Sequence, residues 1–306
     1  MESGLIEIRQ KLSDPQRAIM ESTSNLNLFL GGFGSGKTYL LGLITYRFIK
    51  KYPEVRGFIG ANTYLQLTQS TLFRIREYWK NIGITEYDKN INPGGFYVIN
   101  KHPPPRFKQD NHNFDDYNGI ISFENGAVIF VGSLERGSAH AGKEIGWAVL
   151  DETWDTKEEN VKEIILSRIR QKGIYLINNK LENKGQPSQQ FNPLYITTSP
   201  AKVDWINEMF ELDKYANEIS SLIYSRKTFF HKVIGDKCAV ISSTYHNIQN
   251  VGENYINNII NNNSQERAKS LIYANPFTTT GGEFYTSFNR LVHVDEVPVM
   301  DNKPVH

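Results

Sequence analysis

The sequence predicts an α/β fold with a central, mainly parallel sheet flanked by helices. Short apolar runs alternate along the chain with segments of helical spacing, a pattern typical of parallel strands joined by crossover helices. The stretch GGFGSGKT at residues 31–38 stands between an apolar run and a helical segment, as a strand, a loop and a helix would. At 306 residues, 39% of them hydrophobic, the chain is long enough to bury a large core.

The first half of the chain predicts an opening helix and then two pairs of strand and helix. The opening helix spans residues 12–22, with Ser13 as its N-cap and Gln16 three residues later, which is the spacing of a capping box. Because each strand is followed by a helix, we expect the strands to be parallel. The pattern predicts strands at residues 25–30 and 56–61 and helices at residues 38–52 and 64–79.

The second half begins with an irregular segment. Residues 84–118 are rich in turn-forming residues, and we expect an insertion on the surface. Residues 120–133 predict a hairpin, since two β-rich runs meet at Asn125 and Gly126. The remaining pattern predicts strands at residues 147–153, 193–200 and 238–244 and helices at residues 159–171, 203–212 and 248–273.

Charge and composition argue against several classes of protein. The formal net charge of +1 provides no overall attraction to nucleic acid, so any such contact would come from a local patch or from several subunits. The single cysteine, Cys238, can form no internal disulfide. The first residues do not have the pattern of a signal peptide, and no stretch approaches the roughly 18 apolar residues of a membrane span. We therefore expect a cytosolic protein without membrane contact.

The glycine-rich stretch matches the Walker A pattern in full, with a strand before it and a helix after it. Glycines allow the backbone to curl so that successive N–H groups point at phosphate oxygens, next to a helix N-terminus. Lys37 would place a charge on the β and γ phosphates, and the Thr38 hydroxyl would ligate Mg²⁺. The sequence therefore predicts a P-loop NTPase that uses ATP and Mg²⁺. We expect its phosphate loop to consist of Gly31, Gly32, Phe33, Gly34, Ser35, Gly36, Lys37 and Thr38.

Two adjacent carboxylates follow the apolar run at residues 148–150. Asp151 would hold Mg²⁺, directly or through water, and Glu152 would accept a proton from the attacking water. Neighbouring acids also occur as a helix cap, but the preceding strand favours the catalytic interpretation because ligands bind at the carboxyl ends of such strands. A glutamate placed to activate water indicates hydrolysis. It also predicts the P-loop subtype that has an additional strand and a catalytic glutamate.

The order of the motifs resembles the ATPase domain of tailed-bacteriophage large terminase subunits, the motors that pump double-stranded DNA into empty capsids. The resemblance covers roughly residues 10–290, nearly the whole chain. The segments that carry it are Gln16, GGFGSGKT, ANTYLQLTQSTL (61–72), SLERGSAHAGKEIGWAVLDET (133–153), ILSRIRQ and YITTSP. Walker A alone is generic, whereas this succession is specific.

Further residue roles follow from the resemblance. Gln16 is similar to the family's adenine-side glutamine, although a capping box explains it equally well. Arg136 resembles an arginine finger that reaches the ATP of a neighbouring subunit, a role that suits a planar and permanently charged guanidinium. Thr197, Thr198 and Ser199 resemble a coupling motif that senses the γ phosphate. One departure is that Ala61 and Asn62 stand where many members carry a basic residue.

The resemblance also implies a division of the chain. We expect a P-loop ATPase core at residues 1–204, a small lid or linker subdomain at 205–290, and the start of a linker at 291–306. In the family this linker leads to an RNase H-like nuclease, which needs several carboxylates to hold two metals. The chain ends at His306, before such a cluster, so we expect no nuclease activity from it.

The function implied is an ATP-hydrolysing motor that translocates double-stranded DNA into the procapsid. The implied partners are DNA, the portal protein and procapsid, and the small terminase subunit. Working subunits would form a homo-oligomeric ring and isolated ones would be monomers, in the cytoplasm of an infected bacterium and docked at the capsid portal during packaging. Three alternatives remain: a helicase-like or other DNA-remodelling ATPase, a small-molecule kinase, and a non-catalytic ATP-binding module.

Overall fold

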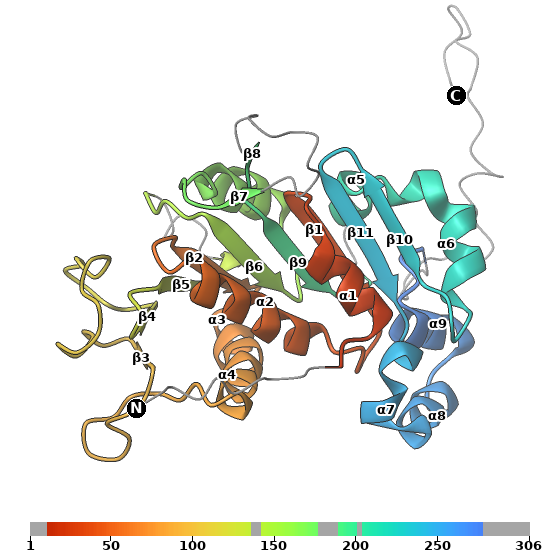
Figure 1. Cartoon of the computed structure of the whole chain (residues 1–306). Coiled ribbons are helices and arrows are strands. Elements are labelled where there is room, and N and C mark those ends of the chain that lie inside the picture. The colour runs from red at the N-terminus through yellow and green to blue at the C-terminus, as the bar shows by residue number, and fades with distance from the viewer. Residues whose placement is uncertain (1–10, 136–141, 177–188, 201–203, 278–306) are drawn as a thin grey trace, which may run out of the picture.

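The computed structural model describes residues 11–135, 142–176, 189–200 and 204–277. Among these residues, the main sheet has nine strands in the order β10-β11-β1-β9-β6-β2-β5-β4-β3 (Figure 1). The strands from β11 to β5 in this order pair in parallel, and antiparallel strands extend both edges. The predicted mainly parallel α/β fold is therefore confirmed.

The strands match the apolar runs of the sequence within a few residues. Four of them were not predicted: β3, β7, β8 and β10. The strands are β1 (Leu26–Gly31), β2 (Gly57–Ala61), β3 (Tyr97–Ile99), β4 (Ile120–Phe123), β5 (Val128–Ser133), β6 (Trp147–Asp151), β7 (Tyr175–Leu176), β8 (Gln189–Gln190), β9 (Leu194–Thr198), β10 (Phe230–Ile234) and β11 (Lys237–Ser242).

The helices that flank the sheet differ in regularity. The long helix after the phosphate loop is α-helical throughout, whereas the helix predicted at residues 64–79 contains a π-helical turn. The helices are α1 (Asp14–Glu21), α2 (Lys37–Lys51), α3 (Tyr64–Gln66), the π-helical η1 (Leu67–Thr71), α4 (Leu72–Asn81), the π-helical η3 (Asn160–Ile165), the 3₁₀ helix η4 (Leu166–Arg168), α5 (Trp205–Met209), the 3₁₀ helix η6 (Leu212–Tyr215), α6 (Ala216–Ile223), the 3₁₀ helix η7 (Thr244–Asn247), α7 (Ile248–Val251), α8 (Glu253–Asn261) and α9 (Gln265–Tyr273).

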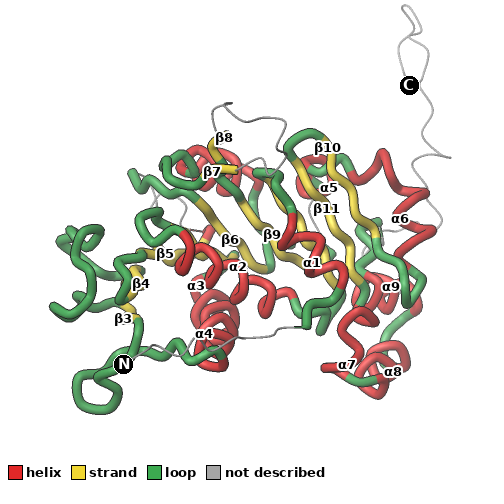
Figure 2. Tube along the Cα trace, in the orientation of Figure 1, coloured by secondary structure: helices red, strands yellow, loops and turns green. Residues whose placement is uncertain are grey.

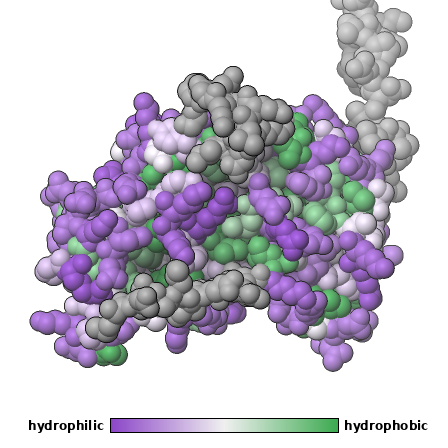
Figure 3. Space-filling model, in the orientation of Figure 1, coloured by the Kyte–Doolittle hydropathy of each residue, from purple (hydrophilic) through white to green (hydrophobic). Residues whose placement is uncertain are grey.

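The central strands are buried on both faces, which explains their near-continuous apolar runs. In β1, Phe29 packs into the core beneath α1, α2 and α4, whereas Leu28 and Leu30 pack into the core beneath η3, α5 and α6. On the first face Phe48 of α2 stacks on Trp147 of β6, with ring centroids 5.0 Å apart. Figure 3, in the orientation of Figure 1, shows a largely hydrophilic surface on this face, with apolar side chains gathered toward its middle.

The insertion predicted at residues 84–118 is not confined to the surface. Loops dominate this end of the molecule (Figure 2), but β3 pairs with the hairpin strand β4 and extends the sheet. The side chains of Tyr97, Val98 and Phe107 are buried. The physical reason is that the edge of β4 has backbone groups to satisfy, and apolar side chains of the insertion cover it.

Two predicted helices have a different form. The segment predicted as a helix at residues 159–171 leaves the helix after Arg168, because the Arg168 carbonyl accepts the N–H of Ile145 at 3.0 Å instead of continuing the helix. The single helix predicted at residues 248–273 consists of α7, α8 and α9. Gly252, at φ 79° and ψ 156°, separates the first two, and the Ser264 side chain caps the third.

Part of the range predicted as a small subdomain belongs to the main sheet. Strands β10 and β11 lie within residues 205–290, yet β11 pairs in parallel with β1. Helices α7–α9 instead share a separate apolar cluster around Tyr245, Ile256 and Ile272. The division into domains stays a prediction, and residues 291–306 lie outside the described part.

Within the described residues, no helix combines the length and apolar character needed to cross a membrane.

Candidate functional site

The phosphate loop joins the carboxyl end of β1 to the N-terminus of α2, a helix of 15 residues. Gly36 is the N-cap of this helix and has a φ of 85°, in the left-handed region that side chains rarely adopt. A Cβ atom there would also lie 2.6 Å from Gln16 Nε2. Glycine at this position thus permits the turn that directs the first N–H groups of α2 into the pocket.

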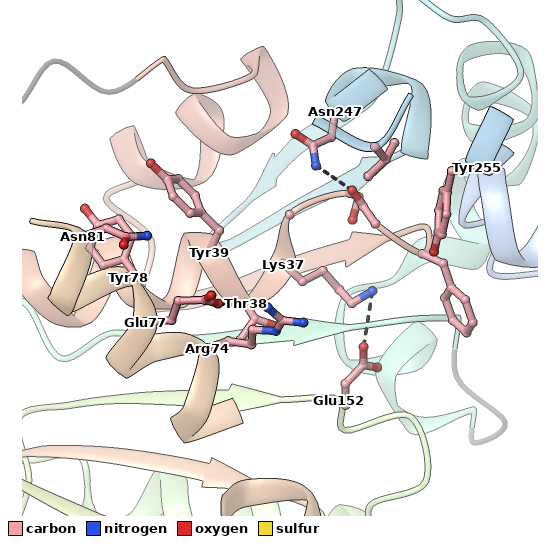
Figure 4. A pocket seen from close by; sticks show the side chains of 15 residues that line it. Lys37, Thr38, Tyr39, Arg74, Glu77, Tyr78, Asn81, Glu152, Asn247 and Tyr255 are labelled. Carbon is pink, nitrogen blue, oxygen red and sulfur yellow. Dashed lines mark hydrogen bonds and ion pairs between the residues drawn. The ribbon is translucent and has the colours of Figure 1, made fainter. Parts of the chain in front are cut away.

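Lys37 is buried, with 7% of its surface exposed, and its ammonium group is fully engaged. It donates to the carbonyl oxygens of Gly31 at 3.1 Å and Gly32 at 3.3 Å. It also donates to Ser199 Oγ at 3.1 Å. It pairs with Glu152 Oε1 at 3.3 Å, as Figure 4 shows. The residue predicted to hold phosphates therefore contacts the predicted base and the predicted coupling motif directly.

The order of strands brings these three motifs together. Strand β9 lies between β1, which leads into the phosphate loop, and β6, which leads into the two carboxylates. Ser199 follows β9, and its N–H and hydroxyl both donate to the Glu152 carboxylate, at 3.2 and 3.4 Å. Glu152 itself has a φ of 48°, a strained conformation of the kind that gathers at functional sites.

Asp151 is buried, and each of its carboxylate oxygens accepts one threonine hydroxyl. Thr197 of β9 donates to Oδ1 at 2.7 Å, and Thr71 of the π-helical turn donates to Oδ2 at 2.8 Å. Burial raises the pKa of Asp151 to about 6, and the neighbouring charge of Glu152 adds to this rise; the two hydroxyls and Lys37 oppose it. A nearby cation would relieve the burial penalty on the charged carboxylate, as expected of a metal ligand.

A cavity of about 610 Å³ lies over the phosphate loop, with Lys37 and Thr38 at its floor (Figure 4). Within the loop, Ser35 Oγ is buried and has no hydrogen-bond partner among the described residues. The cavity is lined by Phe33, Gly34, Ser35, Gly36, Lys37, Thr38, Tyr39, Arg74, Glu77, Tyr78, Asn81, Glu152, Asn247, Val251 and Tyr255.

These features fit a nucleoside triphosphate with Mg²⁺. The described residues contain no group of three or more His, Cys, Asp or Glu side chains that could hold a metal ion by themselves. Mg²⁺ commonly binds through one or two protein oxygens together with phosphates and water, and the Thr38 hydroxyl and the Asp151 carboxylate offer such oxygens. Residues and nucleotide would thus share the metal.

The C-terminal helices η7 and α9 also contact the phosphate loop. Asn247 Nδ2 donates to the Gly34 carbonyl at 2.6 Å, and Thr244 Oγ1 donates to the Phe33 carbonyl at 2.8 Å. The Phe33 N–H in turn donates to the Leu271 carbonyl of α9 at 2.7 Å. Any shift of the phosphate loop at Phe33 or Gly34 would therefore change its hydrogen bonds with η7 and α9.

Sequence patterns alone did not identify Thr71, Thr244 or Asn247 as site residues. Thr71 lies in a segment predicted as a helix, but nothing in its surroundings marks it as the partner of a carboxylate 80 positions later. Thr244 and Asn247 lie at or just after a predicted strand, and polar residues at the carboxyl end of a parallel strand are a usable signal. That signal is present at the end of β11.

The sequence matches the family described as terminase large subunit, T4likevirus-type, N-terminal, over residues 28–290. The chain belongs to this family. The match runs from within β1 past the last described residue and includes the phosphate loop, the two carboxylates and the motif after β9. The comparison with curated proteins gave no match.

Solved terminase structures have a similar fold. The large terminase ATPase domain of Thermus phage P74-26 has a TM-score of 0.51 and 13% identity, over 86% of this chain and 93% of that chain. The large terminase of a thermophilic bacteriophage has a TM-score of 0.53 and 12% identity, over 86% of this chain and 53% of that chain. The complex of that second terminase with ATP-gamma-S has a TM-score of 0.53 and 11% identity, over 86% of this chain and 52% of that chain. The chain thus spans about half the length of this second terminase.

The remaining residues named from the terminase resemblance have different outcomes. Gln16 is buried and makes both kinds of contact: its Oε1 accepts the Ser13 N–H at 3.0 Å, as in a capping box, and its Nε2 donates to the Gly36 carbonyl at 3.3 Å. It therefore ties α1 to the phosphate loop, and its role toward adenine stays a prediction. Arg136 lies outside the described residues.

Proposed function

We propose that this chain is the ATP-hydrolysing motor domain of a viral large terminase, which couples hydrolysis to movement of double-stranded DNA. The observation that carries the proposal is the contact of Lys37, Ser199 and Glu152 at the carboxyl ends of neighbouring strands. A phosphate-binding cation, a strand-end hydroxyl and a carboxylate are in direct reach of one another. Hydrolysis needs these groups together, whereas phosphate binding alone needs only the first.

The phosphate loop would hold the nucleotide. The backbone N–H groups of Gly34, Gly36, Lys37 and Thr38 and the Lys37 ammonium would bind phosphate oxygens. Ser35 Oγ would add a further donor. Thr38 and Asp151 would hold Mg²⁺, which would neutralise part of the phosphate charge. In the same cavity, Asn247 would keep the loop in shape through its bond to the Gly34 carbonyl.

Glu152 would act as the general base. Its carboxylate pairs with Lys37 at 3.3 Å, and phosphates are the stronger partner for that ammonium group. When ATP binds, Lys37 would transfer its contact to phosphate and release one carboxylate oxygen. That oxygen could then accept a proton from the attacking water.

Thr197, Thr198 and Ser199 would couple hydrolysis to movement. Thr197 donates to Asp151 and Ser199 to Glu152, while the Thr198 hydroxyl donates to the Ser199 carbonyl at 3.0 Å. A change in phosphate content at the site would therefore change the contacts of β9 and of the segment after it. This supports the coupling role that the terminase resemblance implies.

The proposal is tested by Glu152→Gln, which keeps the size of the side chain and removes the base. We expect ATP turnover to fall by roughly 10²- to 10⁴-fold, the range for loss of a general base, while binding of ATP-gamma-S persists. The matched control is Glu158→Gln, an exposed carboxylate paired with Lys162, which should leave turnover unchanged. Normal turnover in Glu152→Gln would show that the base is another group.

The proposed partners follow from the family. They are double-stranded DNA, the portal protein and procapsid, and the small terminase subunit, with working subunits in a homo-oligomeric ring docked at the portal in the cytoplasm of an infected bacterium. A net charge of +1 supports the ring, since one subunit would attract DNA weakly and several around a duplex would grip it together.

The family match supports this function over a helicase-like ATPase and over a small-molecule kinase. A kinase would also have less need of a carboxylate at the position of Glu152. A non-catalytic ATP-binding module would bind nucleotide equally well in the wild type and in Glu152→Gln and would turn over ATP in neither. The same experiment therefore separates it from the motor.

A further inference from the structure

A second cavity opens beside the nucleotide pocket. It has a volume of about 360 Å³ and shares Phe33 and Glu152 with the larger pocket, so the two meet at the phosphate loop and the proposed base. Among its lining residues, Glu152 is the one carboxylate and Arg267 the one cation. The lining residues are Phe33, Gln66, Glu152, Trp154, Ser199, Pro200, Arg267, Ser270 and Leu271.

Arg267 reaches this cavity because of its place on α9. Residues 267, 270 and 271 are spaced by three and four positions, so they share one face of the helix, and all three line the cavity. The Leu271 carbonyl on this face accepts the N–H of Phe33 at 2.7 Å. The face that carries Arg267 is thus fixed directly to the phosphate loop.

The guanidinium of Arg267 has no carboxylate partner within the part of the chain that the structure describes. The neighbouring cation on α9 is different: Lys269 pairs with Glu266 at 2.9 Å and does not line the cavity. Arg267 is exposed rather than packed away. A permanently charged group without a partner, in a cavity that borders a phosphate site, has an anion as its natural ligand.

We propose that Arg267 contacts the γ-phosphate of the ATP bound by its own subunit. This rests on the proposed function. The Arg267 guanidinium, on α9, would be a second cation at the γ-phosphate besides the Lys37 ammonium, on α2. It would stabilise the charge on the transferring phosphoryl group. Because α9 belongs to the C-terminal helices, the contact would also make these helices respond to the presence of the third phosphate.

The test compares the affinity of two nucleotides in the presence of Mg²⁺, ADP and ATP-gamma-S, measured by calorimetry on the whole chain. In Arg267→Gln we expect ATP-gamma-S affinity to fall about tenfold or more and ADP affinity to stay unchanged, since charge-assisted hydrogen bonds to phosphate are strong. Arg267→Lys should recover part of the loss. Lys269→Gln, the matched change on the same helix, should change neither affinity.

The outcomes separate this proposal from the proposed function. If the wild type binds neither nucleotide, the proposed function fails. If the wild type binds both and Arg267→Gln binds them with the wild-type ratio, Arg267 does not contact the γ-phosphate and the present inference is overturned. An equal loss of both affinities in Arg267→Gln would also overturn it, because the residue would then support the site as a whole.

Discussion

At the residue scale, Asp151 is a charged group that is almost fully buried. It is 1% exposed, so its negative charge has lost its water, and the hydroxyls of Thr71 and Thr197 replace only part of that hydration. Burial accordingly raises its pKa to about 6. Burial disfavours the charged Asp151 carboxylate while no cation is near, and for the same reason it would make this carboxylate a good ligand for Mg²⁺.

Asp151→Asn should stabilise the nucleotide-free protein at neutral pH. The pKa of Asp151 rises from 3.8 to about 6 on folding, so the folded state keeps a proton that the unfolded chain has lost, and stability falls as pH rises between these values. Above pH 6 the buried charge lowers the free energy of unfolding by its full amount, up to about 3 kcal/mol at 1.4 kcal/mol per pKa unit. The variant should therefore melt a few °C higher at pH 7.5, and the difference should vanish near pH 4.

Thermal unfolding followed by circular dichroism at both pH values measures this difference. A variant that melts lower than the wild type at pH 7.5 would contradict the assignment of Asp151 as a buried anion that destabilises the nucleotide-free protein. In either case the variant should lose Mg²⁺-dependent ATP turnover.

Thr71→Val should weaken the site through Asp151. The valine has nearly the same shape but leaves Oδ2 without its donor, which costs about 1–3 kcal/mol for a buried polar group. We expect a higher Mg²⁺ requirement and a lower turnover, with Thr71→Ser close to the wild type. Turnover measured against Mg²⁺ concentration tests this; identical curves for the valine variant and the wild type would show that the Thr71 bond has no role in positioning Asp151.

At the element scale, the position of β9 organises the site. Because β9 lies between β1 and β6, its carboxyl end delivers Thr197 and Ser199 to the two carboxylates and to Lys37. The π-helical turn η1 adds Thr71 from the next layer, and such turns are frequent at functional sites. The C-terminal end of α9 contacts the phosphate loop through the Leu271 carbonyl, which accepts the Phe33 N–H.

Gly32→Ala should disrupt the contact between the phosphate loop and α9. An added Cβ would lie 2.4 Å from the Ile272 carbonyl oxygen and 2.6 Å from Thr244 Oγ1, and a backbone carbonyl cannot move aside cheaply. We expect a loss of about 1–3 kcal/mol in stability and a clear loss of nucleotide affinity. Gly94→Ala is the control, since a Cβ there meets nothing within 4 Å. Equal behaviour of the two variants in melting and ATP-gamma-S binding would rule out this packing argument.

At the scale of the whole molecule, the rim of the nucleotide cavity is exposed. Several large apolar or aromatic side chains at or near the cavity are exposed, among them Phe33 and Tyr255. The terminase resemblance predicts that a second subunit supplies Arg136 to this site. Arg136 lies outside the described residues, so its role stays a prediction that activity in mixed assemblies can test.

Arg136→Ala should therefore inhibit wild-type protein in mixtures. If Arg136 acts across subunits, each variant subunit deprives its neighbour's site of a cation, and turnover should fall by more than dilution alone predicts. ATP turnover measured at constant total protein, with DNA present and a rising fraction of variant, provides the readout. Turnover that is linear in the fraction of wild type would argue against a finger acting in trans.

Much of the fold was predictable because its signals are local. Burial on both faces makes β1, β6 and β9 continuous apolar runs, and the glycines of the phosphate loop encode their own turn. The strand β3 and the bend after Arg168 were missed, since each depends on pairing with a segment that is not adjacent in the chain. The strand β10 was missed although it pairs with β11, the strand that directly follows it. Short edge strands have little periodicity by which to be recognised.

Local patterns were enough to specify the α/β class, the phosphate loop, the carboxylates Asp151 and Glu152, and the terminase resemblance. The phosphate loop and the two carboxylates each lie in a few consecutive residues, so the chemistry of those residues encodes them. The fold class and the resemblance follow from the order of such local signals along the chain. The folded chain was needed to show that Lys37, Ser199 and Glu152 touch, that Thr71 supports Asp151, and that Arg267 lines a cavity next to the same site. These contacts join residues that strand order and helix packing bring together across long stretches of chain, and no local pattern encodes such pairings.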